Sequence, residues 1–145
     1  MQGNLNENVK TVQALDPDNY AASAHNGTAI DTRGYQDIEY TLQVGDMGTN
    51  GTIAAKVQES DASGSGYADI TGAAITAMTQ ATPDQSNKAA IIRIRLQAPR
   101  KRYQRIVVTP GTAASDLGVI AKLSGPSDHK PITQPSYVDQ VVSVE

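Results

Sequence analysis

The basic residues of this 145-residue chain are unevenly distributed. Six of its 12 Lys and Arg residues fall between positions 93 and 105, and one tyrosine lies among them. Guanidinium and ammonium groups bind the phosphate or carboxylate groups of a partner. The residues that we expect to contact a partner are Arg93, Arg95, Arg100, Lys101, Arg102, Tyr103 and Arg105, together with Tyr137 from a separate C-terminal segment.

The overall charge limits which partner such a cluster would meet. The chain carries a net charge of −3 and has a pI of about 5.3. Nucleic-acid-binding modules usually combine a basic surface with several stacking aromatic residues, and only Tyr103 lies inside this cluster. We therefore expect no nucleic-acid partner. Two interpretations stay open: the cluster meets an acidic protein surface, or its charges are solvated or paired within the chain.

Other residue types that carry chemistry are absent or badly placed. There is no cysteine, and the two histidines, His25 and His129, have no metal-binding spacing. Residues 59–66 resemble the first half of a calcium loop, but Gly72 stands where the closing acidic ligand belongs. We interpret that segment as a hairpin loop. We expect no catalytic residue, no metal, no cofactor and no enzymatic activity.

The clearest structural pattern lies in residues 35–45. Ile38, Tyr40, Leu42 and Val44 alternate with polar residues, which is typical of a strand with one buried face. Residues 52–59 alternate in the same way after the turn-forming sequence Gly48-Thr49-Asn50-Gly51. We predict that these two strands form an antiparallel hairpin.

A second hairpin is expected around the basic cluster. Residues 88–97 form a strand with Ile92 and Ile94 inward and Arg93 outward, and residues 103–109 form the returning strand. This hairpin would bring Arg102 and Arg105 close to Arg93 and Arg95. Further short strands are predicted at residues 28–31, 67–70, 73–80 and 117–123, the last with Leu117, Val119, Ala121 and Leu123 on one face.

These short strands, separated by Gly, Pro and Asn turns, predict a single-domain all-β protein, an antiparallel β sandwich or jelly roll with extended N- and C-terminal arms. We expect an N-terminal arm at 1–27, with a turn or short helical turn at Asp16-Pro17-Asp18, and a body at 28–126. A proline-containing arm follows at 127–145, in which residues 137–144 have the pattern of a final strand. No apolar run approaches the ~20 residues of a membrane span, and no basic-then-apolar segment opens the sequence. We expect no membrane partner and no Sec-type signal.

Several motifs, taken in order, resemble a known group. Asn26-Gly27-Thr28-Ala29-Ile30-Asp31 precedes the alternating strand, Lys56-Val57-Gln58-Glu59-Ser60-Asp61 precedes a Gly/Ser loop, and Lys101-Arg102-Tyr103-Gln104-Arg105 opens a late strand. Their order and spacing over residues 26–126 are similar to those of small proteins from tailed-phage head gene clusters. Within that group the sequence resembles capsid cement, or decoration, proteins with a β jelly roll.

The resemblance implies a structural virion protein on the outer surface of an icosahedral capsid. Its partner would be the major capsid protein, whose neighbouring subunits it would staple together. The resemblance also implies a homo-oligomer, a dimer or trimer. Extended arms suit such a role, because an extended segment adds a strand to a neighbour's exposed sheet edge.

Two alternatives stay open. One is a β domain associated with the tail, connector or fibre of a virion. The other is a carbohydrate-binding β sandwich, which normally presents aromatic platforms to the sugar. The absence of tryptophan and the scattered tyrosines disfavour the second alternative.

Overall fold

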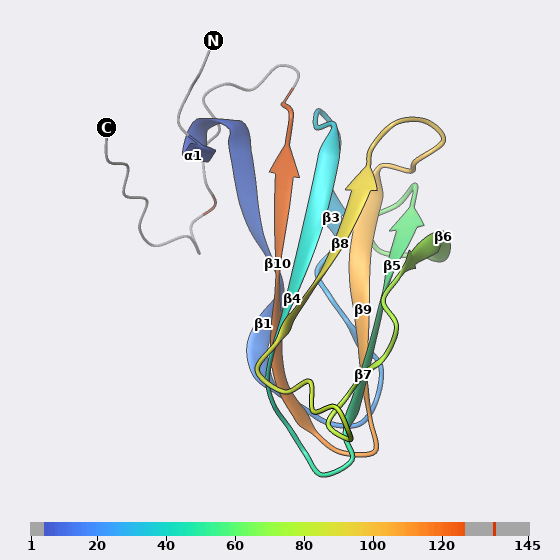
Figure 1. Ribbon diagram of the computed structural model, residues 1–145. Helices are drawn as coiled ribbons and strands as arrows, with labels where there is room; N and C mark the ends of the chain where they lie inside the picture. Colours follow the sequence, from blue (N-terminus) through green and yellow to red (C-terminus); the bar gives the residue numbers. More distant parts are fainter. Residues whose placement is uncertain (1–4, 127–134, 136–145) are drawn as a thin grey trace.

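The computed structural model describes residues 5–126 and residue 135. Within that part of the chain, a four-residue helix is followed by ten strands (Figure 1). In chain order these elements are α1 (Leu5–Asn8), β1 (Val9–Tyr20), β2 (His25–Asn26), β3 (Ile30–Asp31), β4 (Asp37–Met47), β5 (Thr52–Ser60), β6 (Ala68–Ala74), β7 (Met78–Thr79), β8 (Ala89–Arg95), β9 (Tyr103–Gly111) and β10 (Ser115–Ser124).

The strands form two sheets, which we name sheet A and sheet B. Sheet A has the order β1-β10-β4-β8. Sheet B has the order β2-β9-β5-β6, with β3 also paired to β9 and β7 also paired to β5. Every pairing is antiparallel, and the chain changes sheet at each connection except β2 to β3 and β5 to β6 to β7. This is the topology of a jelly roll, so the predicted fold class is confirmed.

The core lies between the two sheets. On β4, the predicted inward residues Ile38, Tyr40, Leu42 and Val44 are at most 2% exposed. The facing side chains of sheet B include Ile53, Val57, Ile106 and Val108, all fully buried. The predicted inward residues of β10 are buried as well. Alternation therefore identified the buried face of each of these strands correctly.

Both predicted hairpins are wrong. Strand β4 belongs to sheet A and β5 to sheet B, so the turn at Gly48–Gly51 crosses the sandwich instead of joining paired neighbours. Strands β8 and β9 are likewise in different sheets. The physical reason is that alternation specifies which face of a strand is buried but not which strand lies beside it. The hairpin predicted around residues 59–66 does form, because β5 pairs with β6.

The predicted N-terminal arm needs correction. Residues 9–20 form β1, which pairs with β10 along its length and buries Val12, Ala14 and Leu15. The expected helical turn at Asp16-Pro17 is instead an irregularity within β1, where the register shifts between Leu15 and Asp18. A bulge is one of the few places where proline fits a strand. The predicted arm at 127–145 and its strand at 137–144 lie outside the described residues, apart from residue 135.

Two predicted strands are shorter than expected, whereas the strand predicted at 67–70 continues through Gly72 as β6. The edge strand at 28–31 is reduced to β3 (Ile30–Asp31), which pairs with β9. The segment at 73–80 is divided between the end of β6 and the two-residue β7. Both segments lie at the edges of sheet B, where a strand has one partner only.

Candidate functional site

The structure divides the predicted basic cluster into two groups. Arg93 and Arg95 lie on β8, at an edge of sheet A. The other four basic residues lie on the β8–β9 loop and on β9 of sheet B. Because β8 and β9 are not paired, Arg102 and Arg105 do not share a face with Arg93 and Arg95. The expectation that one hairpin would gather all six cations is therefore wrong.

The two arginines of β8 share a single carboxylate. Arg93 Nη2 lies 3.6 Å and Arg95 Nε 3.9 Å from Oδ1 of Asp37 on the neighbouring β4. Both arginine side chains are well exposed, at 63% and 73%. At these distances and exposures the ion pairs add little to stability, and the local charge is not fully balanced.

The β8–β9 loop is held by acidic residues from β5 and the loop that follows it. Arg100 Nη1 lies 3.5 Å from Glu59 Oε1, and the backbone N–H of Lys101 donates to Glu59 Oε2 at 3.0 Å. Lys101 Nζ lies 3.1 Å from Asp61 Oδ2. One acidic residue thus anchors the loop through both a side chain and the backbone.

Arg102 and Asp31 form a bidentate pair. Arg102 donates from Nε to Oδ1 at 3.0 Å and from Nη2 to Oδ2 at 2.8 Å. This hydrogen-bonded cation lowers the pKa of Asp31, and the carboxylate raises the pKa of Arg102. The guanidinium also lies 5.0 Å from the ring centroid of Tyr103. The pair joins the short edge strand β3 to the beginning of β9.

Arg105 belongs to a network on the outer face of sheet B. Its Nε and Nη2 atoms donate to Gln58 Oε1 at 3.0 and 2.8 Å, and its guanidinium lies 4.2 Å from the ring centroid of Tyr67. Gln58 in turn donates to Asp69, which also pairs with Lys56 at 2.8 Å. Arg105 is therefore held by partners within the chain through two hydrogen bonds and one ring contact.

A small hollow of about 330 Å³ lies between the β3–β4 loop and the β8–β9 loop. We name it the cationic hollow, because four of its lining residues are basic. Arg100, Lys101 and Arg102 each have a carboxylate partner, whereas Arg33 forms no ion pair with another described residue. The full lining is Thr32, Arg33, Gly34, Tyr35, Leu96, Arg100, Lys101 and Arg102. Sequence reasoning did not single out Arg33, because it lies 60 positions before the first residue of the cluster.

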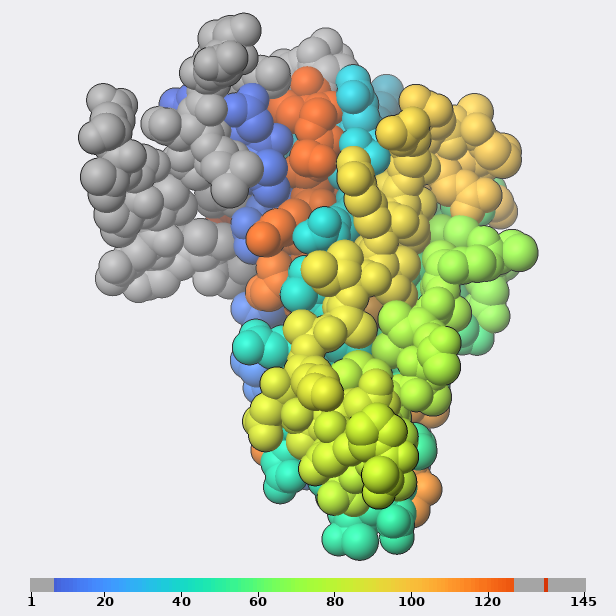
Figure 2. All heavy atoms as spheres, in the orientation of Figure 1, coloured from blue at the N-terminus to red at the C-terminus, as the bar shows by residue number. Residues whose placement is uncertain are grey.

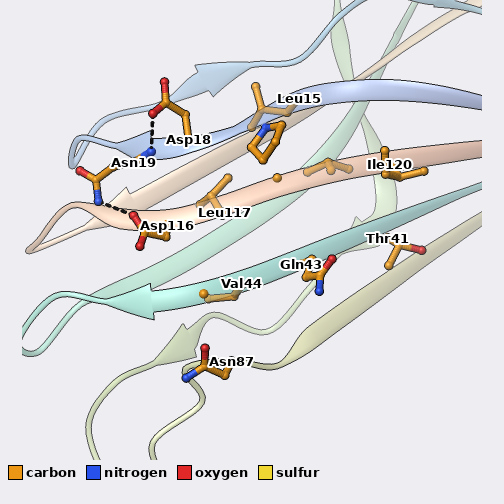
Figure 3. A pocket seen from close by; sticks show the side chains of 14 residues that line it. Leu15, Asp18, Asn19, Thr41, Gln43, Val44, Asn87, Asp116, Leu117 and Ile120 are labelled. Atoms are coloured by element: carbon orange, nitrogen blue, oxygen red, sulfur yellow. Dashed lines mark hydrogen bonds between the residues drawn. The ribbon is translucent and has the colours of Figure 1, made fainter. Parts of the chain in front are cut away.

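A larger hollow of about 770 Å³ lies over the outer side of sheet A (Figure 3). Residues of β1, β10 and β4 line it, including Thr41 and Gln43 of β4 and Ile120 of β10. Asn19 at its rim donates to Asp116 Oδ1 at 2.7 Å. In Figure 2 the yellow residues of β8 run along the front of the molecule beside the cyan of β4. We name this outer side the sheet A face.

The sequence analysis did not pick out the sheet A face, although a signal was present. Among the described residues, the exposed large hydrophobic side chains are Ile91 at 60% and Ile120 at 38%. Both occupy outward positions of strands whose alternate positions are buried. When one face of a strand meets water, its outward positions are usually polar, so an apolar residue at such a position breaks the pattern.

The remaining candidates behave as structural elements. In the 59–66 loop, Ser60 Oγ donates to the carbonyl of Ser65, and Tyr67 donates to that of Ser63. His25 Nε2 lies 2.9 Å from the carbonyl oxygen of Ala21, and its ring contacts Tyr20 edge-on. Within residues 5–126 no group of His, Cys, Asp and Glu side chains is arranged to hold a metal ion. His129 and Tyr137 lie outside the described residues.

No protein-family model matches the chain, and no curated protein does. Several solved structures resemble its fold, and two of them have TM-scores above 0.5. One is described as the PBSX exported protein XepA, with a TM-score of 0.55 and 14% identity over 100% of this chain and 45% of that chain. The other is described as infectious bursal disease virus Gx strain, with a TM-score of 0.53 and 8% identity over 85% of this chain and 34% of that chain.

The likeness establishes the fold. At these identities it assigns neither family nor function. The chain spans less than half the length of either of those chains. In the described part of the chain, no helix has the length and apolar character needed to cross a membrane.

Proposed function

We propose that this chain is a structural, non-enzymatic virion protein that binds the outer surface of an icosahedral tailed-phage capsid and staples neighbouring major capsid subunits. The ordered motifs of residues 26–126 support this proposal, and so does the jelly-roll topology on which they lie. Of the two solved structures compared above, one is described as an exported protein of PBSX and the other as a strain of infectious bursal disease virus. The proposal therefore depends mainly on the surface of this chain.

The observation that carries the proposal is the cationic hollow. Two loops from opposite parts of the sequence place Arg33, Arg100, Lys101 and Arg102 around one hollow with Tyr35. Arg33 helps to lower the pKa of the nearby Asp31, but its guanidinium forms no ion pair with a described residue. A guanidinium presents paired N–H donors that match the two oxygens of a carboxylate. The hollow therefore suits an Asp or Glu side chain on a loop of the capsid subunit.

The same geometry favours a protein partner over nucleic acid. Three of the four cations already have carboxylate neighbours in the chain, so the excess charge is small and local. Tyr103 and Tyr67 lie beside the chain's own arginines, Arg102 and Arg105, which leaves fewer free ring faces for bases. A short acidic segment needs only one or two such contacts to be positioned.

The test is co-sedimentation with undecorated, expanded capsids of the parent phage. We expect the wild-type chain to sediment with the capsids at low salt and less at moderate salt, because exposed ion pairs are screened. Arg33→Glu should abolish or greatly reduce binding. Lys88→Glu is the matched control, because Lys88 is an exposed cation at the opposite end of β8 from the hollow.

If the wild-type chain fails to sediment with the capsids at both salt concentrations, the proposed capsid role is wrong. Equal loss with Lys88→Glu and Arg33→Glu would instead attribute binding to net charge and not to the hollow. Circular dichroism of each variant would verify that the β sandwich is retained.

A further inference from the structure

An apolar row crosses the middle of the sheet A face. In the strand register, Ile120 of β10 lies opposite Thr41 of β4, and Thr41 lies opposite Ile91 of β8, while Gln13 of β1 ends the row beside Ile120. The two isoleucines are the exposed large hydrophobic side chains of the described residues, and one row contains both. Side chains opposite one another on antiparallel strands share a face, so the row runs perpendicular to the strands.

The rows on either side of it differ in size. Toward the end of the sandwich that holds the cationic hollow, the next outward row has the long side chains Lys122, Glu39 and Arg93 on β10, β4 and β8, and the shorter Thr11 on β1. Toward the other end, the corresponding row consists of Gly118, Gln43 and Ala89. The face is therefore raised on one side of the apolar row and lower on the other.

The raised side of the face is mainly positive and the lower side carries carboxylates. Lys122, Arg93 and Arg95 lie on the raised side, where Glu39 and Asp37 only partly balance them. Asp18 and Asp116 line the hollow on the low side. Figure 3 shows both of these carboxylates beside β1 and β10, away from Thr41 and Ile120. Lys88, at the start of β8, has Asp84 as an electrostatic neighbour.

From this pattern we infer that the sheet A face binds a second copy of the chain, with a two-fold axis along the apolar row. That operation places each isoleucine against its own counterpart. It also places Arg93 of one copy over the small residue Ala89 of the other, and directs Lys122 toward Asp18 and Asp116. One face thus supplies both the protruding and the receiving half of the interface, as a two-fold contact requires.

The alternative two-fold axis, parallel to the strands, fits less well. It would set the long side chains against each other and would leave a gap over Ala89, whereas Gly118 is already covered by Pro17 of β1. It would also bring the carboxylates of Asp18 and Asp116 in the two copies toward each other. Ile91 would then face the β1 edge of the other copy instead of Ile91.

The size of the face indicates how tight such a dimer is. Four strands spaced about 4.8 Å apart, with about 3.4 Å per residue over the length of β8, span a plan area of about 450 Å² per copy. That places the contact at the low end of specific interfaces. We therefore expect a concentration-dependent dimer. The inference does not depend on the capsid role, because the purified chain alone should show it.

The experiment is analytical ultracentrifugation of the full chain over a wide concentration range. We expect a monomer–dimer equilibrium in the micromolar range for the wild type. Ile91→Glu should weaken the dimer at least about tenfold, since it places two like charges on the axis. Thr71→Glu is the matched control, because Thr71 is an exposed residue on β6 of sheet B. A wild-type chain that stays monomeric up to about 1 mM, a range typical of the weakest specific contacts, would overturn the inference.

Charge exchange tests the orientation of the two copies. Lys122→Glu should weaken the dimer, and the double variant Lys122→Glu, Asp18→Lys should restore it, because the contact crosses between copies. Absence of rescue would contradict the proposed axis. A dimer that neither Ile91→Glu nor Lys122→Glu weakens uses another surface, and the inference would be wrong.

Cysteine cross-linking gives an independent measure, because the chain has no cysteine of its own. Ile91→Cys should form a disulfide-linked dimer under mild oxidation, since each Ile91 faces its counterpart across the axis. Thr71→Cys should give only the slow, random cross-linking of an exposed thiol. Equal rates for the two variants would contradict the assigned interface, even if a dimer is present.

Discussion

The outer faces of the two sheets differ in how their exposed polar and apolar side chains are arranged. On sheet B, Arg105, Gln58, Asp69 and Lys56 form a continuous chain of hydrogen bonds, and Tyr67 covers the guanidinium. On sheet A, two isoleucines are exposed and two arginines share one carboxylate at long distance. On its outer face, sheet B therefore engages these polar groups within the chain, whereas sheet A leaves apolar surface and charge available to a partner.

The pKa of Asp69 reflects the same difference. Hydrogen bonds from Lys56 and Gln58 lower it below its ordinary value, although the carboxylate is exposed. Such a network positions each side chain through its neighbours. A face organised in this way offers few unsatisfied groups to a second protein. The lesson is that polar character alone does not mark a binding face; what matters is whether its charges are already paired.

The largest predicted effect separates the inner and outer faces of a single strand. Leu123 of β10 is fully buried, whereas Ile120 on the same strand is 38% exposed. Leu123→Ala should lower the free energy of unfolding by about 3 kcal/mol, because it leaves a cavity in the core. Ile120→Ala should lower it by less than about 1 kcal/mol. Urea unfolding of both variants at a concentration where the chain is monomeric measures the difference.

A comparable loss from Ile120→Ala in the monomer would mean that this side chain is part of the core. In that case the sheet A face would lose half of its apolar row as a binding surface. Repeating the measurement at high protein concentration adds a further check. There, Ile120→Ala should become more costly, because the folded dimer is stabilised by mass action.

These faces could be predicted from the sequence only in part. Alternation identified Ile38, Tyr40, Leu42 and Val44 as buried, and it also leaves Ile91 pointing outward. It could not identify neighbours, because hydrogen bonding between backbones is the same for any two strands of suitable length. A tight turn such as Gly48–Gly51 connects paired strands in a hairpin, but here it crosses between sheets. The hairpins were therefore assigned wrongly.

Strand β1 was missed for a related reason. Ala14 and Leu15 are both buried although they are consecutive, because the register shifts beside them. A bulge interrupts alternation and makes a strand resemble an irregular segment. The basic cluster shows the same limit for the site: closeness in sequence brought Arg100, Lys101 and Arg102 together, but Arg33 joins them only through the fold.

A smaller effect compares two arginines, one on each outer face. Arg105→Ala removes two hydrogen bonds to Gln58 and the contact with Tyr67, so it should lower the free energy of unfolding by about 1 kcal/mol. Arg93→Ala removes only an exposed ion pair at 3.6 Å, so the change should stay within about 0.5 kcal/mol. Urea unfolding at low protein concentration measures both. Equal losses would contradict the view that only sheet B is internally networked.

The smallest predicted effect concerns the ion pair beside the cationic hollow. Hydrogen bonds from Arg102 lower the pKa of Asp31 below its ordinary value of 3.8. A carboxyl group whose pKa is lowered by folding stabilises the folded state fully above its unfolded pKa, and that contribution is lost as the pH falls through the folded pKa. The stability difference between the wild type and Asp31→Asn should therefore be constant near neutral pH and shrink below about pH 4.

The effect is small because both side chains of this pair are 44% exposed, where solvent screens the interaction. Urea unfolding of the wild type and of Asp31→Asn between pH 3 and pH 7 measures it. Arg102→Gln provides the control, because without this cation the replacement of Asp31 should change the pH dependence less, the remaining effect coming from Arg33. A stability difference that grows as the solution is acidified would show that the carboxylate is held in an unfavourable environment. In that case the Arg102–Asp31 pair would not hold β3 against β9 beside the cationic hollow, and Arg33 would bind a partner without that support.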